Sequence, residues 1–459
     1  MERNILLINP WIYDFAAYDL WIMPLGLLYL AGLLRYNGYG VSYIDCLDIS
    51  DPLMQEFLVD NHIRIRRNPD GTGKFFKAFL EKPDTLKNVP RKYGRYGITL
   101  DIFNRRLRMA PHPEAVLITS MMTYWYPGVA KVIELVRDYD HRIPILLGGN
   151  LVTLCPEKAQ SLGADWCISG EGEQKVLHVL QEITGQSIHY LPDLEDLDTL
   201  PFPAFDLQRR IPFIPLQTSR GCPFRCIYCA SPLLYSGIRQ RSLASVMKEI
   251  EYALRAYRVH HFVFYDDALG YRASDHLIPI LQEVRAGKLP VYFHTPNALH
   301  AREITSELAG LLHDTGFRHL RLGFETSHPL QQKITGGKVT NDQFQRALRN
   351  LHRAGYSPGH IGAYILAGLP EQRVKEVEET VDFVLSQGAY PVLAEFSPIP
   401  GTPAWSHYLR NSFYMPASEP LFHNNSILPC QWEGFSWEDY LQLKIKIRAK
   451  LGHIGKSPE

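Results

Sequence analysis

Short apolar runs alternate with longer stretches of helical periodicity along most of the chain. In the N-terminal part the apolar runs predict strands at 4–9, 41–45, 115–120, 143–147 and 166–169. The amphipathic stretches between or after them predict helices at 24–37, 126–139 and 173–183. Because strands that alternate with helices form parallel sheets covered on both faces, this part is predicted to be a doubly wound, Rossmann-like α/β domain.

The same alternation restarts after residue 205. Apolar runs predict six further strands, at 214–218, 262–265, 291–294, 320–325, 363–367 and 393–396. Helical patterns lie between them, and six such units predict a partial (β/α)6 barrel of the TIM type rather than a closed barrel of eight. Functional residues of such a barrel gather at the carboxyl ends of its strands.

A proline-containing acidic stretch separates the two alternating parts. Residues 192–205 include Pro201 and Pro203 and are predicted to be an inter-domain linker. The predicted domains are the α/β domain at 1–191 and the barrel at 206–404, and a C-terminal extension at 405–459 contains a predicted helix at 437–451.

The α/β domain contains a basic insertion at 62–108, with 13 Lys and Arg against four Asp and Glu. Two interpretations are open: a basic lid that binds an anion, or a solvated helical excursion. We favour the second, because runs of charge usually mark solvated faces.

Composition and charge exclude several classes of protein. The 459 residues are 46% hydrophobic and carry no net charge. A general nucleic-acid-binding protein would have an excess of basic residues, which this chain does not have. The longest apolar run, at 22–34, contains Pro24 and is too short to span a bilayer. The chain begins with a predicted strand rather than a signal peptide, so we expect a cytoplasmic protein with reduced cysteines.

Three cysteines lie in one loop after the first predicted barrel strand. Cys222, Cys226 and Cys229 have the spacing C-x3-C-x2-C. Three thiolates can hold three irons of a cubane 4Fe–4S cluster, whereas structural zinc usually has four ligands and no second pair of cysteines or histidines follows nearby. The loop resembles the signature of the radical S-adenosylmethionine (radical SAM) enzymes. The resemblance implies that the three cysteines bind the cluster and that its open iron binds S-adenosylmethionine.

Further motifs in the barrel resemble cofactor-binding motifs of the same family. By resemblance, Tyr228 packs on adenine, Asp266 and Asp267 meet the methionyl amino group, and Glu325 lies near the ribose or methionyl end. The turn with Gly368 and Pro370 would contact adenine through its backbone. Two alternatives remain open: Tyr228 as a core aromatic, and Asp267 as a helix N-cap.

Residues on or after the third predicted barrel strand are candidates for a substrate pocket. They are Tyr292, His294, Asn297 and His300. A histidine on a strand is more often structural than functional, so each carries the alternative of a purely structural role.

The N-terminal domain resembles the cobalamin-binding domain that precedes the barrel in one branch of the family. The resemblance rests on the first helical stretch and on turns that contain Ser120, Gly148, Gly149, Gly170 and Glu171. Glycines at such turns let a ligand approach the backbone closely.

The loop after the second strand departs from that pattern. The family's Asp-x-His-x-x-Gly reads Asp45-Cys46-Leu47-Asp48-Ile49-Ser50 here, with Leu47 in place of the axial histidine. The resemblance then implies cobalamin bound without a protein histidine ligand. The alternative is a domain that has lost cobalamin and serves as another binding module.

These features predict a cobalamin-dependent radical SAM enzyme of the class B methyltransferase type. It is expected to cleave S-adenosylmethionine to a 5′-deoxyadenosyl radical and to methylate an unactivated carbon of a small-molecule or peptide substrate. Cyclisation or rearrangement without methyl transfer is the alternative reaction. The expected partner is an electron donor such as flavodoxin or ferredoxin, with no nucleic acid and no membrane span.

Overall fold

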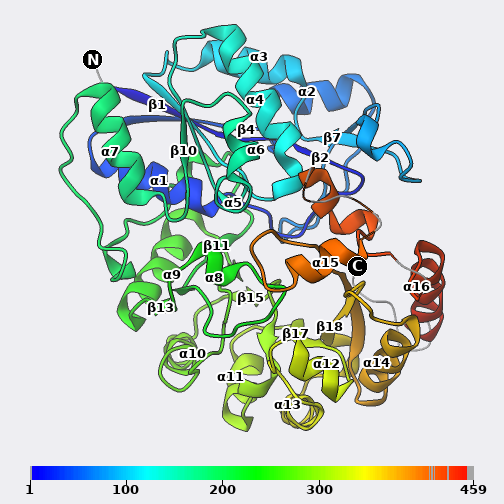
Figure 1. The fold of residues 1–459 in the computed structure, drawn as a ribbon. Helices are drawn as coiled ribbons and strands as arrows, with labels where there is room; N and C mark the ends of the chain where they lie inside the picture. Colours follow the sequence, from blue (N-terminus) through cyan, green and yellow to red (C-terminus); the bar gives the residue numbers. More distant parts are fainter. Residues whose placement is uncertain (1–2, 413, 415–416, 418, 432–433, 452–459) are drawn as a thin grey trace. The chain divides into compact units, whose positions relative to one another are not determined.

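The computed structural model describes residues 3–412, 414, 417, 419–431 and 434–451 (Figure 1). The chain forms two compact units, Met1–Phe213 and Ile214–Glu459. No helix among the described residues is both long and apolar enough to cross a membrane.

The first unit is built on a parallel sheet with the strand order β10-β9-β8-β1-β4. Its strands are β1 (Asn4–Asn9), β4 (Gly40–Asp45), β8 (Ala115–Ile118), β9 (Ile145–Gly148) and β10 (Trp166–Ile168). In chain order this is the doubly wound order 2-1-3-4-5, whose direction reverses between β1 and β8. Ligands of such sheets bind outside the carboxyl ends of the strands at this switch point.

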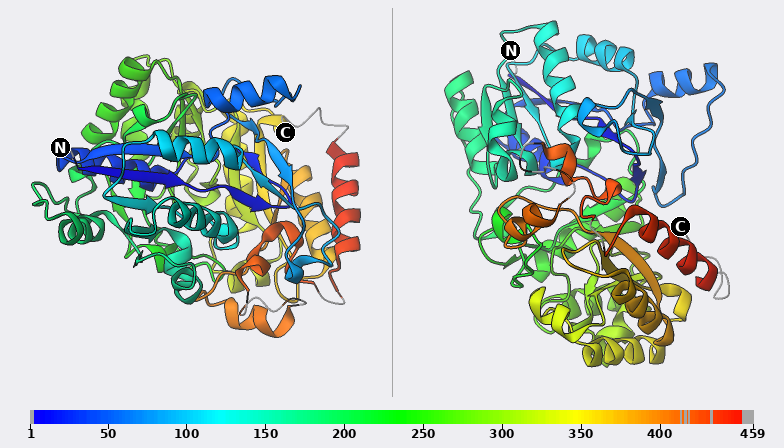
Figure 2. Two further views of the ribbon diagram at one scale, coloured as in Figure 1. Left: turned by 90° about the horizontal axis from the view of Figure 1, so that it is seen from above. Right: turned by 45° about the vertical axis from the view of Figure 1, so that its right-hand side comes forward.

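Helices cover both faces of this sheet (Figures 1 and 2). Ile5 and Leu7 of β1 pack with α1 (Leu25–Tyr36) and α7 (Glu173–Thr184). Leu6 and Ile8 point to the other face, because side chains alternate along a strand. The helices on that face include α2 (Pro52–Asp60), α3 (Leu100–Met109) and α4 (Tyr126–Tyr139).

Most of the basic insertion is irregular and carries three short strands, whereas a helical excursion was favoured; its α-helix, α3 (Leu100–Met109), comes at its end. Its strands β5 (Gly73–Lys74), β6 (Lys77–Phe79) and β7 (Gly94–Tyr96) pair antiparallel with one another or with β2 (Ile12–Asp14) and β3 (Tyr18–Asp19). The physical reason is burial of its aromatic side chains: Phe75 and Tyr96 form an apolar cluster with Ile12 and Leu47. Charged residues of the insertion therefore surround an apolar anchor.

Segment 192–205 runs along helix α1 within the first unit. The N–H of Ala204 donates to the carbonyl of Leu28 at 3.0 Å, and Phe205 is buried. A Cβ on Gly32 would lie 2.4 Å from the carbonyl oxygen of Phe202, so a glycine in α1 permits this approach. Just beyond the segment, Asp206 accepts hydrogen bonds from Arg35 at 2.8 Å.

The second unit is the predicted partial barrel. Its parallel strands are β11 (Ile214–Leu216), β14 (His261–Phe264), β15 (Tyr292–His294), β17 (Leu320–Glu325), β18 (Ile361–Ala367) and β19 (Tyr390–Glu395). A parallel bridge between Phe293 and Phe317 joins the first three strands to the last three. The helices between them include α9 (Leu243–Tyr257), α10 (Leu277–Ala286), α11 (Ser306–Asp314), α13 (Asn341–Arg353) and α14 (Val374–Ser386).

Strand β17 shows which side chains face the helices and which face the barrel interior. Phe324 stacks on Phe344 of α13 and Phe383 of α14. Its alternating neighbours, Gly323 and Glu325, therefore face the interior. On strand β18, Tyr364 and Leu366 are partly exposed, while the residues that alternate with them are buried.

The C-terminal extension packs on the barrel within the second unit. Helix α15 (Trp405–Asn411) places Tyr408 in a buried cluster with Leu369, Phe396 and Cys430. Helix α16 (Trp437–Leu451) contacts α14, where Lys446 pairs with Glu378. The predicted helix at 437–451 is present at the same residues.

Candidate functional site

The cysteine loop of residues 222–229 lies between β12 (Ser219–Arg220) and the short helix α8 (Ser231–Leu234). Two distant segments hold the loop. The N–H of Ile227 donates to the carbonyl of Thr335, and the N–H of Ala404 donates to the carbonyl of Ile227 at 2.9 Å. A Cβ on Gly336 would lie 3.0 Å from the Cα of Cys226, so only glycine permits this approach without movement.

The three thiols of the loop lie within electrostatic reach of one another. Burial raises the pKa of Cys222 to about 11, and the neighbouring thiols and Asp267 add to the effect. Burial likewise raises the pKa of Cys226 and Cys229. A positively charged ligand is what would stabilise the thiolate forms.

The chemistry of the three thiols fits an iron–sulfur cluster. In the part of the chain that the structure describes, no three Cys, His, Asp or Glu side chains converge as a single zinc ion requires. In a cubane cluster each thiolate binds a different iron, so the sulfurs lie farther apart. The donor set of three soft thiolates therefore fits a 4Fe–4S cluster.

Glu325 ends strand β17 in a strained conformation next to the loop. Its φ of 76° lies in the left-handed region, and the pairing register with β18 shifts between Gly323 and Glu325. Such strain in a residue other than glycine is typical of functional sites. The bulge turns the carboxylate toward Lys338, whose Nζ donates to Oε1 at 3.0 Å.

Lys338 was missed in the sequence, although it follows the glycine pair Gly336-Gly337. Burial lowers its pKa, but the charges of Glu325 and Cys226 outweigh burial and raise it. Lys338 therefore stays charged. A Cβ on Gly323 would lie 2.8 Å from Nζ, so this glycine leaves the space that the ammonium group occupies.

Tyr228 makes the core contacts of one of the two roles that the sequence left open. Its ring packs against the cluster of Leu369 and Phe396. Its buried hydroxyl lies beside the Glu325 carboxylate and the Cys226 thiol, although neither contact has the geometry of a regular hydrogen bond. Burial and the nearby Glu325 raise the pKa of this hydroxyl well above its usual value, so it is a neutral group within the cysteine loop.

The two aspartates after strand β14 have different surroundings. Asp266 is fully buried and accepts hydrogen bonds from Thr218 and from the hydroxyl of Ser219, so it supports the start of the cysteine loop. Asp267 accepts from the hydroxyl of Ser231 at 2.7 Å, directly after the loop. The next helix, α10, begins at Leu277, so Asp267 is not its N-cap.

The turn with Gly368 and Pro370 is closed by a residue that the sequence did not indicate. Gln372 accepts hydrogen bonds from the N–H groups of Gly368 and Leu369, and its amide donates to Leu366. These two N–H groups of the turn therefore already have a hydrogen-bond acceptor within the protein. Any contact of adenine with this turn would use groups other than those two N–H donors.

In the first unit, Ser120 and Gly149 form one interlocked turn at the switch-point edge. The Ser120 hydroxyl donates to the carbonyl of Gly148 at 2.7 Å, and Asn150 N–H donates to the carbonyl of Ser120 at 2.8 Å. Gly149 has a φ of 96°, and a Cβ there would lie 2.4 Å from the Ser120 carbonyl oxygen. Only glycine fits this position.

Beside that turn the surface is open. A Cβ on Gly148 would have the carbonyl oxygen of Ile168 as its nearest neighbour, at 3.8 Å, and one on Gly26 would meet nothing within 4 Å. Gly170 follows β10, where its N–H donates to Thr153, and Glu171 lies next to it. Small residues and free space at this edge fit a large flat ligand.

Asp45 stabilises the loop after β4, in which Leu47 stands where the family has a histidine. Its carboxylate accepts hydrogen bonds from Asn9, from the Tyr43 hydroxyl and from the N–H of Leu47. Leu47 is buried in the apolar cluster of the insertion. The loop is therefore held by Asp45, and Leu47, at the position of the family's histidine, has no atom that could bind a metal.

Asp48, in the same loop, makes the first unit sensitive to pH. Burial, and secondarily Asp45, raises the pKa of Asp48 to about 6. A carboxyl whose pKa is raised on folding stabilises the fold at low pH, and this stability is lost as the pH rises from about 4 through about 6. The unfolding free energy of the wild type should fall between pH 5 and pH 8 as Asp48 loses its proton. In Asp48→Asn we expect this fall to be smaller by about 1–2 kcal/mol.

Urea unfolding at the two pH values measures this effect. The asparagine can still accept the hydrogen bond from Ser50 N–H. Asp84→Asn, at an exposed carboxylate, is the matched control and should leave the pH dependence unchanged. An equal pH dependence in Asp48→Asn and wild type would contradict the assignment.

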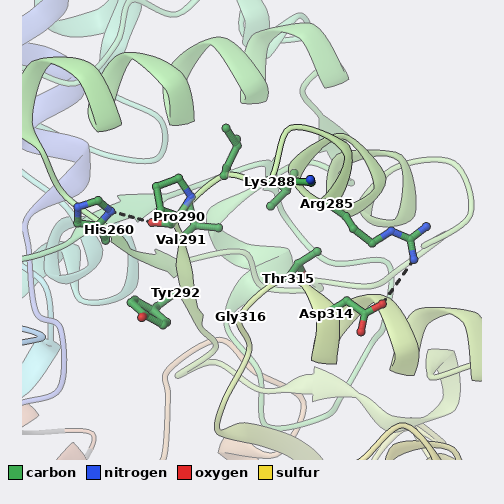
Figure 3. A pocket seen from close by; sticks show the side chains of 11 residues that line it. His260, Arg285, Lys288, Pro290, Val291, Tyr292, Asp314, Thr315 and Gly316 are labelled. Atoms are coloured by element: carbon green, nitrogen blue, oxygen red, sulfur yellow. Dashed lines mark hydrogen bonds and ion pairs between the residues drawn. The ribbon is translucent and has the colours of Figure 1, made fainter.

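A cavity of about 720 Å³ opens at the amino ends of the barrel strands (Figure 3). Its lining includes His260 before β14, Val291 before β15 and Gly316 before β17. Arg285 pairs with Asp314 at its rim at 3.5 Å. It lies at the amino ends of the strands, whereas the cysteine loop and Glu325 follow the carboxyl ends, so it is separate from the candidate site.

Comparisons with known proteins agree with this arrangement. The family model of the radical SAM superfamily matches residues 216–384, and that of the B12 binding domain matches residues 103–180. The chain is a radical SAM protein with a B12-binding domain. The radical SAM domain implies a 4Fe–4S cluster and S-adenosylmethionine as cofactors, and the B12-binding domain implies cobalamin.

Several curated relatives of this radical SAM protein are named as methyltransferases. An uncharacterised methyltransferase of Pyrococcus horikoshii is 24% identical over 336 residues, which are 66% of this chain and 71% of that protein. The bacteriochlorophyllide d C-12(1)-methyltransferase of Chlorobaculum tepidum is 26% identical over 281 residues, or 56% of this chain and 58% of that protein.

Solved structures share the fold of this radical SAM protein. The methyltransferase TsrM of Kitasatospora setae with cobalamin and a [4Fe-4S] cluster has a TM-score of 0.63 at 17% identity, over 88% of this chain and 77% of that one. The cobalamin-dependent enzyme OxsB has a TM-score of 0.58 at 13% identity, over 98% and 62%. The predictions of family, fold and cofactors are confirmed.

Proposed function

We propose that this radical SAM protein methylates an unactivated carbon of a small-molecule or peptide substrate. The supporting observation is the cysteine loop beside the Glu325–Lys338 pair, in a chain that also carries a B12-binding domain. When bound, the cluster supplies the electron for cleavage of S-adenosylmethionine to a 5′-deoxyadenosyl radical, and cobalamin supplies the methyl group. Relatives named for methylation of small molecules support the reaction class.

In this proposal the residues of the barrel bind and orient the cofactors. Cys222, Cys226 and Cys229 hold the cluster. Lys338 attracts the methionyl carboxylate, and Asp267 and Glu325 face the methionyl ammonium and the ribose, because charged groups in a partly buried site bind opposite charges strongly. The Tyr228 ring offers a flat surface for adenine. A reduced flavodoxin or ferredoxin is the proposed electron donor.

The test of this function measures metal content and product mass. The protein is reconstituted anaerobically with iron, sulfide and hydroxocobalamin, desalted, and analysed for iron and cobalt. We expect about four irons and about one cobalt per chain. A product heavier by one methyl group supports the proposal, whereas a product without added mass replaces methylation by cyclisation or rearrangement.

A pair of glycine variants tests the proposed corrinoid surface. Gly148→Val places a side chain in the open space at the end of β9, so we expect normal folding and at least a tenfold weaker retention of cobalamin. Gly149→Ala instead strains a left-handed turn and is expected to lower the melting temperature of the first unit. Cobalt content after desalting and thermal unfolding report the two effects. Full cobalt retention in Gly148→Val would show that the corrinoid does not bind at this edge of the sheet.

A further inference from the structure

His300 is a buried polar side chain beside the cysteine loop. It lies on the short strand β16 (Leu299–His300), which pairs with β17 so that His300 is opposite Gly323. Only 4% of the residue is exposed. Its ring stacks on the ring of Phe224, two residues after Cys222, with a centroid distance of 4.4 Å and an interplanar angle of 29°. The imidazole thus packs directly on the loop proposed to hold the cluster.

The imidazole of His300 is neutral and has an unused nitrogen. Burial lowers the pKa of His300 to about 3, and the charge of Lys338 adds to the effect. A hydrogen bond with the backbone of Asp267 opposes this shift, as a bond donated by the ring would. Nδ1 is buried and has no hydrogen-bond partner among the residues described. In the tautomer of the neutral ring that carries its proton on Nε2, Nδ1 is an acceptor without a donor.

A strained connection brings His300 to this position. Ala298 has a φ of 69°, a left-handed conformation that is unfavourable for a residue other than glycine. The Asn297 amide donates to the carbonyl of Tyr265 at 3.2 Å and anchors the bend to the end of β14. Strain of this kind persists where the surroundings enforce it, and it is typical of binding sites.

His300 also lies next to the charged pair of the candidate site. Gly323 lies opposite His300, and a Cβ built on Gly323 would be 2.8 Å from Lys338 Nζ and 3.9 Å from Glu325 Oε1. A buried acceptor without a donor is unfavourable, so a bound molecule that supplies a donor recovers the lost hydrogen-bond energy. The donors that S-adenosylmethionine offers are its ammonium group and its ribose hydroxyls.

We propose that His300 binds S-adenosylmethionine by accepting a hydrogen bond at Nδ1 from a hydroxyl or ammonium group. The inference rests on the proposed function, which places this cofactor beside the cysteine loop. It adds a neutral acceptor beside the charged groups of Glu325, Lys338 and Asp267. The stack on Phe224 fixes the plane of the ring, so that the acceptor is oriented before the cofactor binds.

Three substitutions separate binding from support of the loop. Asparagine at position 300 keeps a polar group near the place of Nδ1, glutamine keeps one near Nε2, and phenylalanine keeps only the stacked ring. Each protein is reconstituted with iron and sulfide, and its Kd for S-adenosylmethionine is measured by equilibrium dialysis without substrate. The spectrum of the reduced cluster is recorded with and without the cofactor.

We expect all three variants to retain the iron content of the wild type. His300→Gln and His300→Phe should raise the Kd about tenfold and weaken the spectral change on cofactor addition, while His300→Asn stays within about threefold of wild type. Equal Kd values in all four proteins would overturn the proposal, as would a weaker His300→Asn than His300→Gln. Wild-type protein that binds iron but no S-adenosylmethionine would instead contradict the proposed function itself.

Discussion

Replacement of Cys226 by alanine is expected to abolish both the cluster and the cleavage of S-adenosylmethionine. With three thiolates in the loop, each holds a separate iron, and loss of one leaves a second iron without a protein ligand. Cys226 is the most buried of the three, and its backbone packs against Gly336. We expect iron content after reconstitution to fall below one quarter of the wild-type value and formation of 5′-deoxyadenosine to fall below detection.

The control for this variant is a cysteine outside the loop. Cys155→Ala removes a half-buried thiol in the first unit and should leave iron content and cleavage unchanged. The circular dichroism of Cys226→Ala should match that of the wild type, because the loop backbone is also held through Ile227. Full iron content or retained cleavage in Cys226→Ala would remove the basis for the radical assignment to this loop.

The regular elements of the fold could be predicted from local patterns. Strand β1 and helices α4 and α16 have the predicted bounds, because continuous apolar runs and helical periodicity mark elements that are buried on one or both faces. The antiparallel strands of the insertion could not be predicted in this way. β2 and β7 have only three residues each and pair across about 80 positions, so neither has a detectable period of its own.

The candidate site was predicted where a motif is contiguous and missed where it depends on tertiary contacts. The cysteine loop and Glu325 stand out in the sequence, since each follows directly on an apolar strand. Lys338 and Gln372 do not, because their roles arise from a β-bulge at Glu325 and from the closing of a turn at Gly368. A charged residue directly after a pair of glycines, as at Lys338, is a signal worth testing in other chains.

The second large effect is expected at Lys338. Lys338→Met removes the partner of Glu325, whose side chain is only 10% exposed, and leaves this carboxylate unpaired near the sulfurs of Cys226 and Cys229. Loss of one partner of a buried pair costs about 3–5 kcal/mol. We therefore expect a lower melting temperature, weaker assembly of the cluster and at least a hundredfold loss in affinity for S-adenosylmethionine, since the cation proposed to meet its carboxylate is gone.

A double variant separates the structural part of this effect from the binding part. Glu325→Gln combined with Lys338→Met removes both charges, so no carboxylate is left unpaired and much of the lost stability should return. Affinity for S-adenosylmethionine should stay low in the double variant, because no cation is restored. Lys338→Arg keeps the charge, although its planar group is wider than the space beside Gly323, and should bind the cofactor better than Lys338→Met. If the double variant regained wild-type affinity, Lys338 would serve only to neutralise Glu325, and the carboxylate of the cofactor would have another partner.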